Sequence, residues 1–417
     1  MKGKIAVIGG GVAGLTAAHL LCRQYQVQLF EKTDRIGGNA YTYRTRDGEE
    51  VDIAVAAFGK AGYPTFYKLL KHLGIKTRLC LSSYMSFHDL DRGTGIYLTP
   101  GLRGLAAQRF RLLKPSLLRQ IRRLFRGVKK SYRLLDQGAF TDQTLAQALE
   151  RIPELSDEAR IIFICSLCLL SSMSASEVLD SPAEFFFHKL KVHHDVISPK
   201  AVYSVRAVAN KTRSYIDALA APFRDNIVLS ADIRTVERSP QQVSLLFADG
   251  SRASFDKVIF ACHADQALAL LARPNAEEQR LLGPWRYKDG RMLLHADHSS
   301  FPRRALMQAY TFLYTDRQGR FDTSVNGALW HEPGVSRRCR LISSQHPNFE
   351  VAPELVEFET VLRTPIFDFA SVPTIEQLPT LNGNLNSYYC GSYFGHGLHE
   401  DAVSSAVAVA RQLGVEL

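Results

Sequence analysis

The fold of this chain is decided by the stretch KIAVIGGGVAGLTAAHLL, residues 4–21. Residues 4–8 are typical of a fully buried strand, a G-x-G-x-x-G turn follows, and the apolar run after it predicts a helix. The first glycine permits a tight turn, the second lets the backbone approach a pyrophosphate, and the third lets the helix pack closely on the strand. The N–H groups at the start of that helix favour phosphate. The residues expected at the pyrophosphate of a bound dinucleotide are Gly9, Gly11, Val12, Ala13 and Gly14.

An acidic residue and a second glycine cluster follow at the distances that such a unit needs. A second strand is expected over residues 26–30, and Glu31 at its end lies about twenty residues beyond the middle glycine, where an acid hydrogen-bonds ribose hydroxyls. In the next segment, KTDRIGGN over residues 32–39, the glycines allow another close backbone approach and the arginine supplies positive charge. The residues expected to contact the dinucleotide here are Glu31, Lys32, Arg35, Gly37, Gly38 and Asn39.

These motifs resemble the FAD-binding signature of the flavin amine oxidase and phytoene desaturase superfamily, and the resemblance extends over the whole chain. Residues 226–261 resemble its middle FAD segment, in which the position of Val236 lies beside the adenine. The stretch YCGSYFGHGLHEDA, residues 389–402, resembles its C-terminal flavin motif. The resemblance implies an amine oxidase-like α/β fold with non-covalently bound FAD. Its cofactor residues near the C-terminus would be Gly391, Ser392, His399, Glu400, Asp401 and Ala402.

Within that superfamily the chain is most similar to a bacterial branch of NAD/FAD-binding flavoproteins associated with cyclopropane fatty-acid synthases. The resemblance therefore implies a lipid-related oxidoreductase. The sequence departs from the superfamily at two informative positions. Ser392 stands where many members have an acid, and Leu398 stands where amine oxidases place an aromatic residue against the flavin. The missing aromatic wall makes amine oxidation less favoured.

The composition is typical of a globular protein in a reducing compartment. Hydrophobic residues make up 46% of the 417 residues, and no run approaches the roughly eighteen apolar residues of a membrane-spanning helix. Because the nucleotide unit begins close to Met1, no signal peptide is expected. The seven cysteines are scattered, and Cys165 and Cys168 lie in an apolar helical run, which favours buried thiols over a metal or redox pair. We expect a cytoplasmic protein without a metal centre.

The net charge of +10 is concentrated in one segment. Between Asp91 and Asp136 there is no acidic residue, and from residue 109 to 133 basic residues alternate with apolar ones at helical spacing. Three interpretations of this amphipathic helix remain open. It is an ordinary solvated helix face, a surface that docks on an anionic membrane from the cytoplasmic side, or a surface for an acidic partner such as an acyl carrier protein. Nucleic acid is not expected, since no aromatic-interleaved groove motif is present.

The order of elements predicts two interleaved domains. Residues 1–60, 201–262 and 381–417 are expected to form the FAD-binding domain. Residues 63–200, read mostly as helices, and residues 263–380 are expected to form the substrate-binding domain, with an antiparallel sheet within 285–380. The substrate pocket is then expected between this sheet and the helical block.

The catalytic residues are less constrained than the cofactor residues, because the flavin carries the redox chemistry. His396 and His399 are the candidates for a proton relay, since histidine titrates near neutral pH. The alternative is that both rings only cap or pack. Likewise, Glu400 and Asp401 either contact the cofactor or only complement the dipole of the last helix.

The sequence and the resemblance together predict an FAD-dependent oxidoreductase that removes hydride from, or desaturates, a hydrophobic fatty-acyl or lipid-like substrate. Three alternatives remain open: a flavin-dependent amine oxidase, a flavin-dependent double-bond isomerase, and a non-catalytic flavoprotein that assists a lipid-modifying enzyme. The electron acceptor and the oligomeric state are left open as well.

Overall fold

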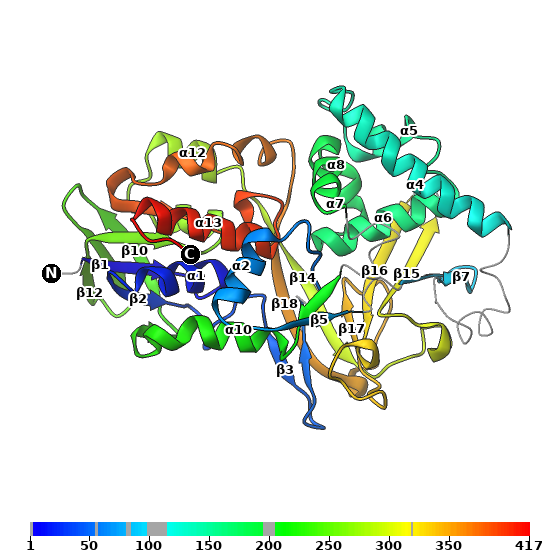
Figure 1. Ribbon diagram of the computed structural model, residues 1–417, viewed down its shortest axis with the longest axis horizontal. Helices are drawn as coiled ribbons and strands as arrows, with labels where there is room; N and C mark the ends of the chain where they lie inside the picture. The colour runs from blue at the N-terminus through cyan, green and yellow to red at the C-terminus, as the bar shows by residue number, and fades with distance from the viewer. Residues whose placement is uncertain (1–2, 55–56, 81–84, 98–114, 195–204, 318–319) are drawn as a thin grey trace.

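The computed structural model describes residues 3–54, 57–80, 85–97, 115–194, 205–317 and 320–417 (Figure 1). One layer is a five-stranded sheet in the order β19-β13-β1-β2-β9, in which every neighbouring pair is parallel. Its strands come from three separate stretches of the chain. They are β1 (Lys4–Ile8), β2 (Gln26–Phe30), β9 (Ile227–Val228), β13 (Lys257–Phe260) and β19 (Ser387–Tyr389).

The central strand of this sheet is buried on both faces, which is why its sequence is a continuous apolar run. Ile5 and Val7 pack in the cluster formed with α1 and α13, whereas Ala6 and Ile8 pack in the cluster formed with a small antiparallel sheet. The elements that cover the two faces include α1 (Val12–Leu21), α2 (Pro64–His72), α10 (Lys211–Ala220), α13 (His399–Gln412), β10 (Ile233–Arg238), β11 (Val243–Phe247) and β12 (Arg252–Phe255).

The second large layer is a seven-stranded sheet in the order β18-β14-β17-β16-β15-β6-β7, on the right of Figure 1. All its pairings are antiparallel except β15 with β6. Its strands are β6 (Met85–Asp89), β7 (Thr94–Tyr97), β14 (Tyr287–His295), β15 (Tyr310–Arg317), β16 (Arg320–Ala328), β17 (Ile342–Gln345) and β18 (Val356–Pro365). This is the antiparallel sheet that the sequence predicts within residues 285–380, extended by two strands from the first quarter of the chain.

Helices form a block on one side of the seven-stranded sheet (Figure 1). They are α4 (Pro115–Asp136), α5 (Leu145–Glu150), α6 (Asp157–Ser171), α7 (Ala175–Asp180) and α8 (Ala183–Val192). In α6, Cys165 and Cys168 are free and buried, as predicted, and burial raises the pKa of the Cys165 thiol to about 12. No helix of the described residues is long and apolar enough to cross a membrane.

Residues 63–200 are less uniformly helical than expected. They contain β6 and β7, and residues 77–79 form a strand that pairs with residues 206–208. The short strand Met85–Asp89 has no strong pattern of its own, and it is a strand because β15 offers it a parallel partner. The remaining elements are β3 (Thr42–Arg44), β4 (Glu50–Asp52), β5 (Thr77–Leu79), β8 (Arg206–Val208), α11 (Ala264–Leu270) and α12 (Ala276–Leu282).

Candidate active site

A cavity of about 890 Å³ runs from the carboxyl ends of β1 and β2 towards the seven-stranded sheet. Its volume lies within the range of roughly 300–1,000 Å³ that is common for ligand sites. The first glycine turn, the segment after β2, the end of β13 and the start of α13 all contribute to its lining. The carboxyl ends of parallel strands are where open α/β sheets bind their ligands. The cavity is therefore the candidate site for the dinucleotide.

The glycine turn has the geometry that its sequence predicts. Gly9 has a φ of +111°, and an ideal Cβ on Gly14 would lie only 1.9 Å from the carbonyl oxygen of Gly9. Gly14 does not line the cavity, so its requirement for glycine comes from the packing of α1 on the turn. Gly11 does line the cavity, and an ideal Cβ there would have no atom of the described chain within 4 Å. Val12 and Ala13 line it as well, at the first turn of α1.

Glu31 and the second glycine cluster form the next part of the wall. Glu31 accepts hydrogen bonds from Gly10 N–H at 2.7 Å and from Thr33 N–H at 2.9 Å, which hold its carboxylate at the end of β2. The Arg35 guanidinium donates to the Gly38 carbonyl oxygen at 2.9 Å and lies 4.1 Å from the centre of the Tyr41 ring. The cavity-lining residues of this segment are Glu31, Lys32, Thr33, Arg35, Gly37, Gly38 and Asn39.

The middle segment requires a correction, because the structure places Val236 away from the cavity. The Val236 side chain is fully buried in the core on β10 and does not line the cavity. Ile233, at the start of the same strand, lines it instead, next to Arg234. An irregularity in the β10–β11 register between Ile233 and Thr235 separates the two positions. Ile233 is therefore the residue of β10 whose place at the cavity the sequence analysis did not predict, and contact between Val236 and an adenine stays a prediction.

The C-terminal motif is divided between the cavity and the protein interior. Its cavity-lining residues are Gly391, Ser392, Tyr393, Gly397, Leu398, His399 and Ala402. Glu400 and Asp401 are not among them. Glu400 accepts from the N–H groups of Thr65 and Phe66 and so caps α2, while Asp401 accepts from Leu398 N–H at 2.8 Å. Neither acid lines the cavity, and backbone N–H groups hold both carboxylates, so their contact with the cofactor stays a prediction.

Burial lowers the pKa of both candidate relay histidines. His399 Nε2 lies 2.7 Å from the Tyr215 hydroxyl, and burial lowers the pKa of the ring to about 4. His396 does not line the cavity, and burial together with the nearby Lys189 lowers its pKa to about 3. The lowered pKa values favour uncharged rings near neutral pH, and a role of these two rings in proton transfer stays a prediction. The structure supports the packing alternative for their side chains.

Because the His399 ring is buried, the free energy of unfolding should depend on pH. The substitution His399→Gln should weaken that pH dependence. The unfolded chain binds a proton at this ring below about pH 6.5 and the folded chain does not, so stability falls as the pH drops. Between about pH 7.5 and 5.5, this residue should cost the folded state up to about 1.4 kcal/mol. Urea unfolding of both proteins at the two pH values measures the difference. An equal loss of stability in the two proteins would contradict the assignment.

Sequence reasoning missed several residues of the site. Cys262, His263 and Gln266 follow β13 and line the cavity. The His263 ring stacks on Tyr287 with centroids 4.4 Å apart, and burial lowers its pKa to about 4. A signal was available, since these residues directly follow a strand of the parallel sheet whose carboxyl end faces the ligand.

Beyond Leu398 the wall of the cavity is formed mainly by apolar and aromatic side chains, with Ser171, Ser172 and His193 among them. Leu169 and Leu170 reach it from the end of α6, and other residues come from the sheets and loops. A second cavity of about 80 Å³ adjoins the first and shares Leu169 and Tyr310 with it. The apolar residues of this part of the site are Ala57, Phe58, Met85, Leu169, Leu170, Val205 and Phe367.

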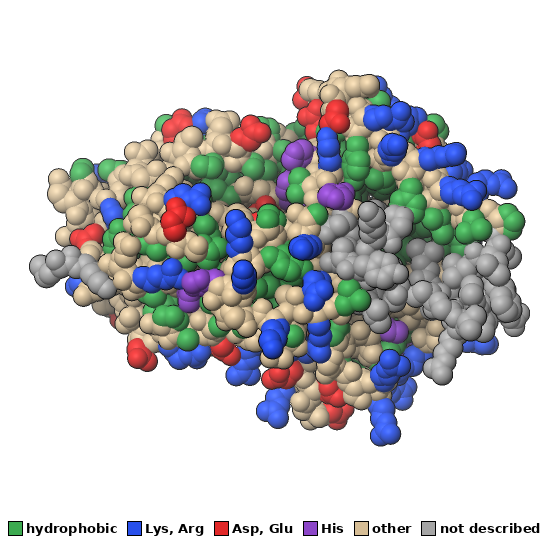
Figure 2. Space-filling view, viewed as in Figure 1, with side chains coloured by type: hydrophobic (Ala, Val, Ile, Leu, Met, Phe, Trp, Pro, Cys, Tyr) green, Lys and Arg blue, Asp and Glu red, His purple; other side chains and the backbone are tan. Residues whose placement is uncertain are grey.

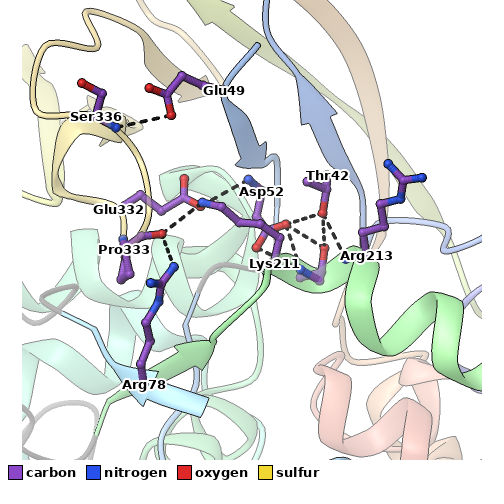
Figure 3. A network of polar contacts seen from close by, with 10 residues as sticks. Thr42, Glu49, Asp52, Arg78, Lys211, Arg213, Glu332, Pro333 and Ser336 are labelled. Atoms are coloured by element: carbon purple, nitrogen blue, oxygen red, sulfur yellow. Dashed lines mark hydrogen bonds and ion pairs between the residues drawn. The ribbon is translucent and has the colours of Figure 1, made fainter. Parts of the chain in front are cut away.

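A buried polar network closes the far side of the second cavity (Figure 3). Asp52 accepts from Thr212 N–H at 3.0 Å and from the hydroxyl groups of Thr212 and Thr42. Glu332 is paired with the ammonium group of Lys211, and both side chains are almost fully buried. Burial raises the pKa of the Glu332 carboxyl to about 7 and also raises that of Asp52. The carboxylates that face this cavity are thus already engaged by the chain's own donors.

The lining fits FAD by its own geometry. Gly11 offers open space in front of the first turn of α1, where free N–H groups favour a pyrophosphate. Glu31 lies at the end of β2, where a ribose is bound in such units. The first turn of α13 supplies a second helix N-terminus at the opposite part of the cavity, through His399 and Ala402. Two helix N-termini and an acid along one cavity suit a phosphate-linked dinucleotide.

Comparisons with known proteins agree with this assignment. Residues 12–289 match the family described as flavin containing amine oxidoreductase. Amine oxidase [flavin-containing] A from Canis lupus familiaris is 40% identical over 77 residues, which are 18% of this chain and 14% of that protein. A zeta-carotene desaturase from Zea mays is 31% identical over 84 residues, or 20% of this chain and 15% of that protein. The chain therefore matches only a small part of the length of these curated relatives.

A solved structure shows the same fold over the whole chain. The fatty acid isomerase from P. acnes, described as producing CLA, superposes with a TM-score of 0.67, and the match covers 98% of each chain at 15% identity. At that identity the likeness shows the fold alone. The family match covers well over half of the chain and includes helix α1 from Val12, Glu31 and Ile233. The chain belongs to the flavin containing amine oxidoreductase family, whose enzymes are of the oxidase and desaturase type, and FAD is its cofactor.

Proposed function

We propose that this protein removes hydride from, or desaturates, a hydrophobic substrate of the fatty-acyl or lipid type. The observation that carries the proposal is the apolar wall beyond Leu398, where Leu169, Leu170 and Met85 line the cavity. An extended apolar chain gains free energy from such a wall, at about 0.8 kcal/mol for each buried CH₂ group. The cavity is thus suited to a substrate with several methylene groups.

The charges of the site argue against a substrate that carries an ammonium group. Among the described residues, four carboxyl groups line the two cavities: Glu31, Asp52, Asp289 and Glu332. Each has a partner within the chain. Glu31 and Asp52 accept from N–H and hydroxyl groups, Asp289 lies 3.7 Å from the Arg363 guanidinium, and Glu332 is paired with Lys211. A cationic amine would find neither a free carboxylate nor an aromatic wall at Leu398.

Bound FAD supplies the hydride acceptor, and the protein supplies position and environment. The first turn of α13 directs N–H groups and the positive end of its dipole into the cavity, next to Leu398. The apolar residues hold the substrate chain and exclude water from the reacting carbon. The side chains of His396 and His399 keep the loop before α13 in place through their contacts with Phe185 and with Tyr215.

Two resemblances favour a lipid substrate in this proposal. The sequence motifs imply a lipid-related oxidoreductase, and one solved structure with the same fold, at 15% identity, is described as a fatty acid isomerase. That structural likeness makes double-bond isomerisation the second candidate. An isomerase converts its substrate without net electron transfer, so the two candidates differ in the final state of the flavin.

Anaerobic bleaching of the flavin tests the proposal. The purified protein should be yellow, and its visible absorption should bleach when detergent-dispersed fatty acids or phospholipids are added without oxygen. Simple primary amines should leave it oxidised. Conversion of a fatty acid with no bleaching would favour the isomerase. Bleaching by amines together with none by any lipid would overturn the proposal in favour of an amine oxidase.

The substitution Leu169→Asn should separate the apolar wall from the cofactor site. Leu169 lines both cavities, so a polar side chain there should slow lipid-dependent bleaching by about tenfold or more, while FAD content stays unchanged. Leu179→Asn is the matched control, because Leu179 is a half-buried leucine of the neighbouring α7 that lines neither cavity. Stopped-flow absorbance gives the rates. Equal slowing in both variants would show that the effect is structural.

A further inference from the structure

We propose that the exposed face of α4 docks this protein on a membrane surface rich in anionic phospholipid. Five basic residues form a single stripe along that helix, Arg119, Arg122, Arg126, Lys129 and Arg133, and all five are exposed. At 3.6 residues per turn they fall within roughly 80° of arc and extend over about 21 Å. Figure 2 shows basic side chains gathered along the α4 edge of the molecule.

The stripe lies directly opposite the buried face of the helix. Leu124, Gly127, Val128 and Ser131 are the buried residues of α4, and they anchor it on the helical block. An ideal Cβ on Gly127 would lie 2.6 Å from the Leu155 side chain, which shows how closely the helix packs on the chain beneath it. The basic stripe is therefore held outward on a fixed support.

The remaining charges of α4 are already balanced, and those of the stripe are not. Arg123 pairs with Asp157 at 3.3 Å, and Lys130 pairs with Glu154 at 3.0 Å. These two residues lie to one side of the stripe. No ion pair joins the five stripe residues to an acid within the described part of the chain. The stripe thus presents uncompensated positive charge to whatever approaches it.

Two features favour a lipid surface over an acidic protein. The charges lie on one straight, convex helix face, which matches a flat sheet of headgroups without needing a complementary shape. Apolar side chains flank the stripe on the side of Leu118, which is 45% exposed, and the half-buried Ile121 and Phe125 follow along the helix. A basic face bordered by apolar residues is the pattern of helices that lie in the membrane interface.

The docking face is also linked to the site. α4 packs on α6, and the C-terminal end of α6 carries Leu169 and Leu170 into the apolar cavity. A protein held at a bilayer by α4 would therefore have its substrate cavity within one helix of the lipid. This connection extends the proposed function, but the docking itself is measured without turnover, so the two proposals can fail separately.

Vesicle sedimentation of the full-length, FAD-loaded protein tests the docking. The wild type should bind mixed phosphatidylcholine–phosphatidylglycerol vesicles at about 0.1 M salt, and should not bind phosphatidylcholine alone. Each basic residue near an anionic surface contributes on the order of fivefold in partitioning. Binding should weaken strongly at about 1 M salt, where the screening length falls to about 3 Å.

A charge-reversal variant and its matched control locate the surface. The triple substitution R119E, R122E and R126E should reduce partitioning by about a hundredfold or more. The control is R337E, R338E and R340E, which makes the same change in net charge at exposed residues outside α4. This control variant should retain binding to the vesicles. Equal loss in both variants would overturn the proposal, because net charge and not α4 would then govern binding.

Two further results decide whether the basic face of α4 binds a lipid surface or an acidic protein. Binding that ignores lipid charge and salt, or no binding to anionic vesicles at all, would overturn the proposal. Salt-sensitive binding of an acidic acyl carrier protein, lost in the α4 variant and without vesicle binding, would assign the face to a protein partner instead. Bleaching by detergent-dispersed lipid should be unchanged in the α4 variant, which keeps this test separate from that of the proposed reaction.

Discussion

The substitution Gly14→Ala is expected to abolish FAD binding and to destabilise the fold. The added methyl group would lie 1.9 Å from the carbonyl oxygen of Gly9, and both partners are backbone atoms of one tight turn. No side-chain rotation relieves that overlap, so α1 would have to move away from β1. We expect a loss of roughly 4 kcal/mol or more in the free energy of unfolding and a colourless protein.

Gly11→Ala is the matched control, because it adds the same methyl group at the N-cap of α1, three residues before Gly14. Gly11 has a φ of −73°, which alanine adopts without strain, and no described atom lies within 4 Å of its ideal Cβ. The apoprotein should therefore keep its stability to within about 1 kcal/mol. The methyl group occupies space in the cavity itself, so FAD affinity should fall by about tenfold or more.

Thermal unfolding and the flavin absorbance of the two variants separate packing from binding. The expected pattern is a large loss of stability for Gly14→Ala and a loss confined to flavin content for Gly11→Ala. A yellow, stable Gly14→Ala protein would refute the packing role of Gly14. A Gly11→Ala protein with unchanged FAD affinity would show that the pyrophosphate does not lie against this turn.

The second large effect is expected from Glu332→Ala, which would leave the Lys211 ammonium group buried without its carboxylate. The Lys211 side chain is only 7% exposed, and its ammonium group also donates to the Pro333 carbonyl oxygen at 3.2 Å. Removing one member of a buried ion pair costs about 3–5 kcal/mol. We expect a loss of that size in urea unfolding, together with a disturbed second cavity.

Two comparisons make this prediction specific. Glu416→Ala removes a carboxylate from the pair with Arg411, in which both side chains are 66% exposed, and should change stability by less than about 1 kcal/mol. The double substitution Lys211→Met and Glu332→Leu removes both charges and should recover most of the stability. A double variant as unstable as Glu332→Ala would show that the pair acts through shape and not through charge.

The cofactor site could be predicted from the sequence wherever its chemistry depends on consecutive residues. The turn before α1, Glu31 at the end of β2 and the glycine cluster after it are local patterns, and the structure places them along one cavity. Val236 could not be placed correctly, since a register irregularity in β10 decides which residue of that strand faces the ligand. The contacts of Glu400 are with Thr65 and Phe66, more than two hundred residues away, and those of Asp401 are with the turn of its own loop. The spacing of residues in the sequence reveals neither set of contacts.

The substrate part of the site depends on long-range contacts. Leu169 and Met85 meet at the same cavity only because α6 packs on the seven-stranded sheet and β15 recruits β6 as a parallel neighbour. Neither segment carries a motif for ligand binding. The lowered pKa values of His396 and His399 also follow from burial among distant residues, which no local pattern in the sequence indicates.

By itself, the sequence determined the FAD-binding fold and the basic, amphipathic character of the helix at residues 115–136. Each is set by steric limits or periodicity within a single turn, strand or helix, so neighbouring residues suffice to specify it. Only the tertiary structure decided that Ile233 and not Val236 lines the cavity, that Glu400 caps α2, and that leucines of α6 reach the cavity. These outcomes depend on which side chains are buried against one another. The packing of segments that are distant in the sequence decides that.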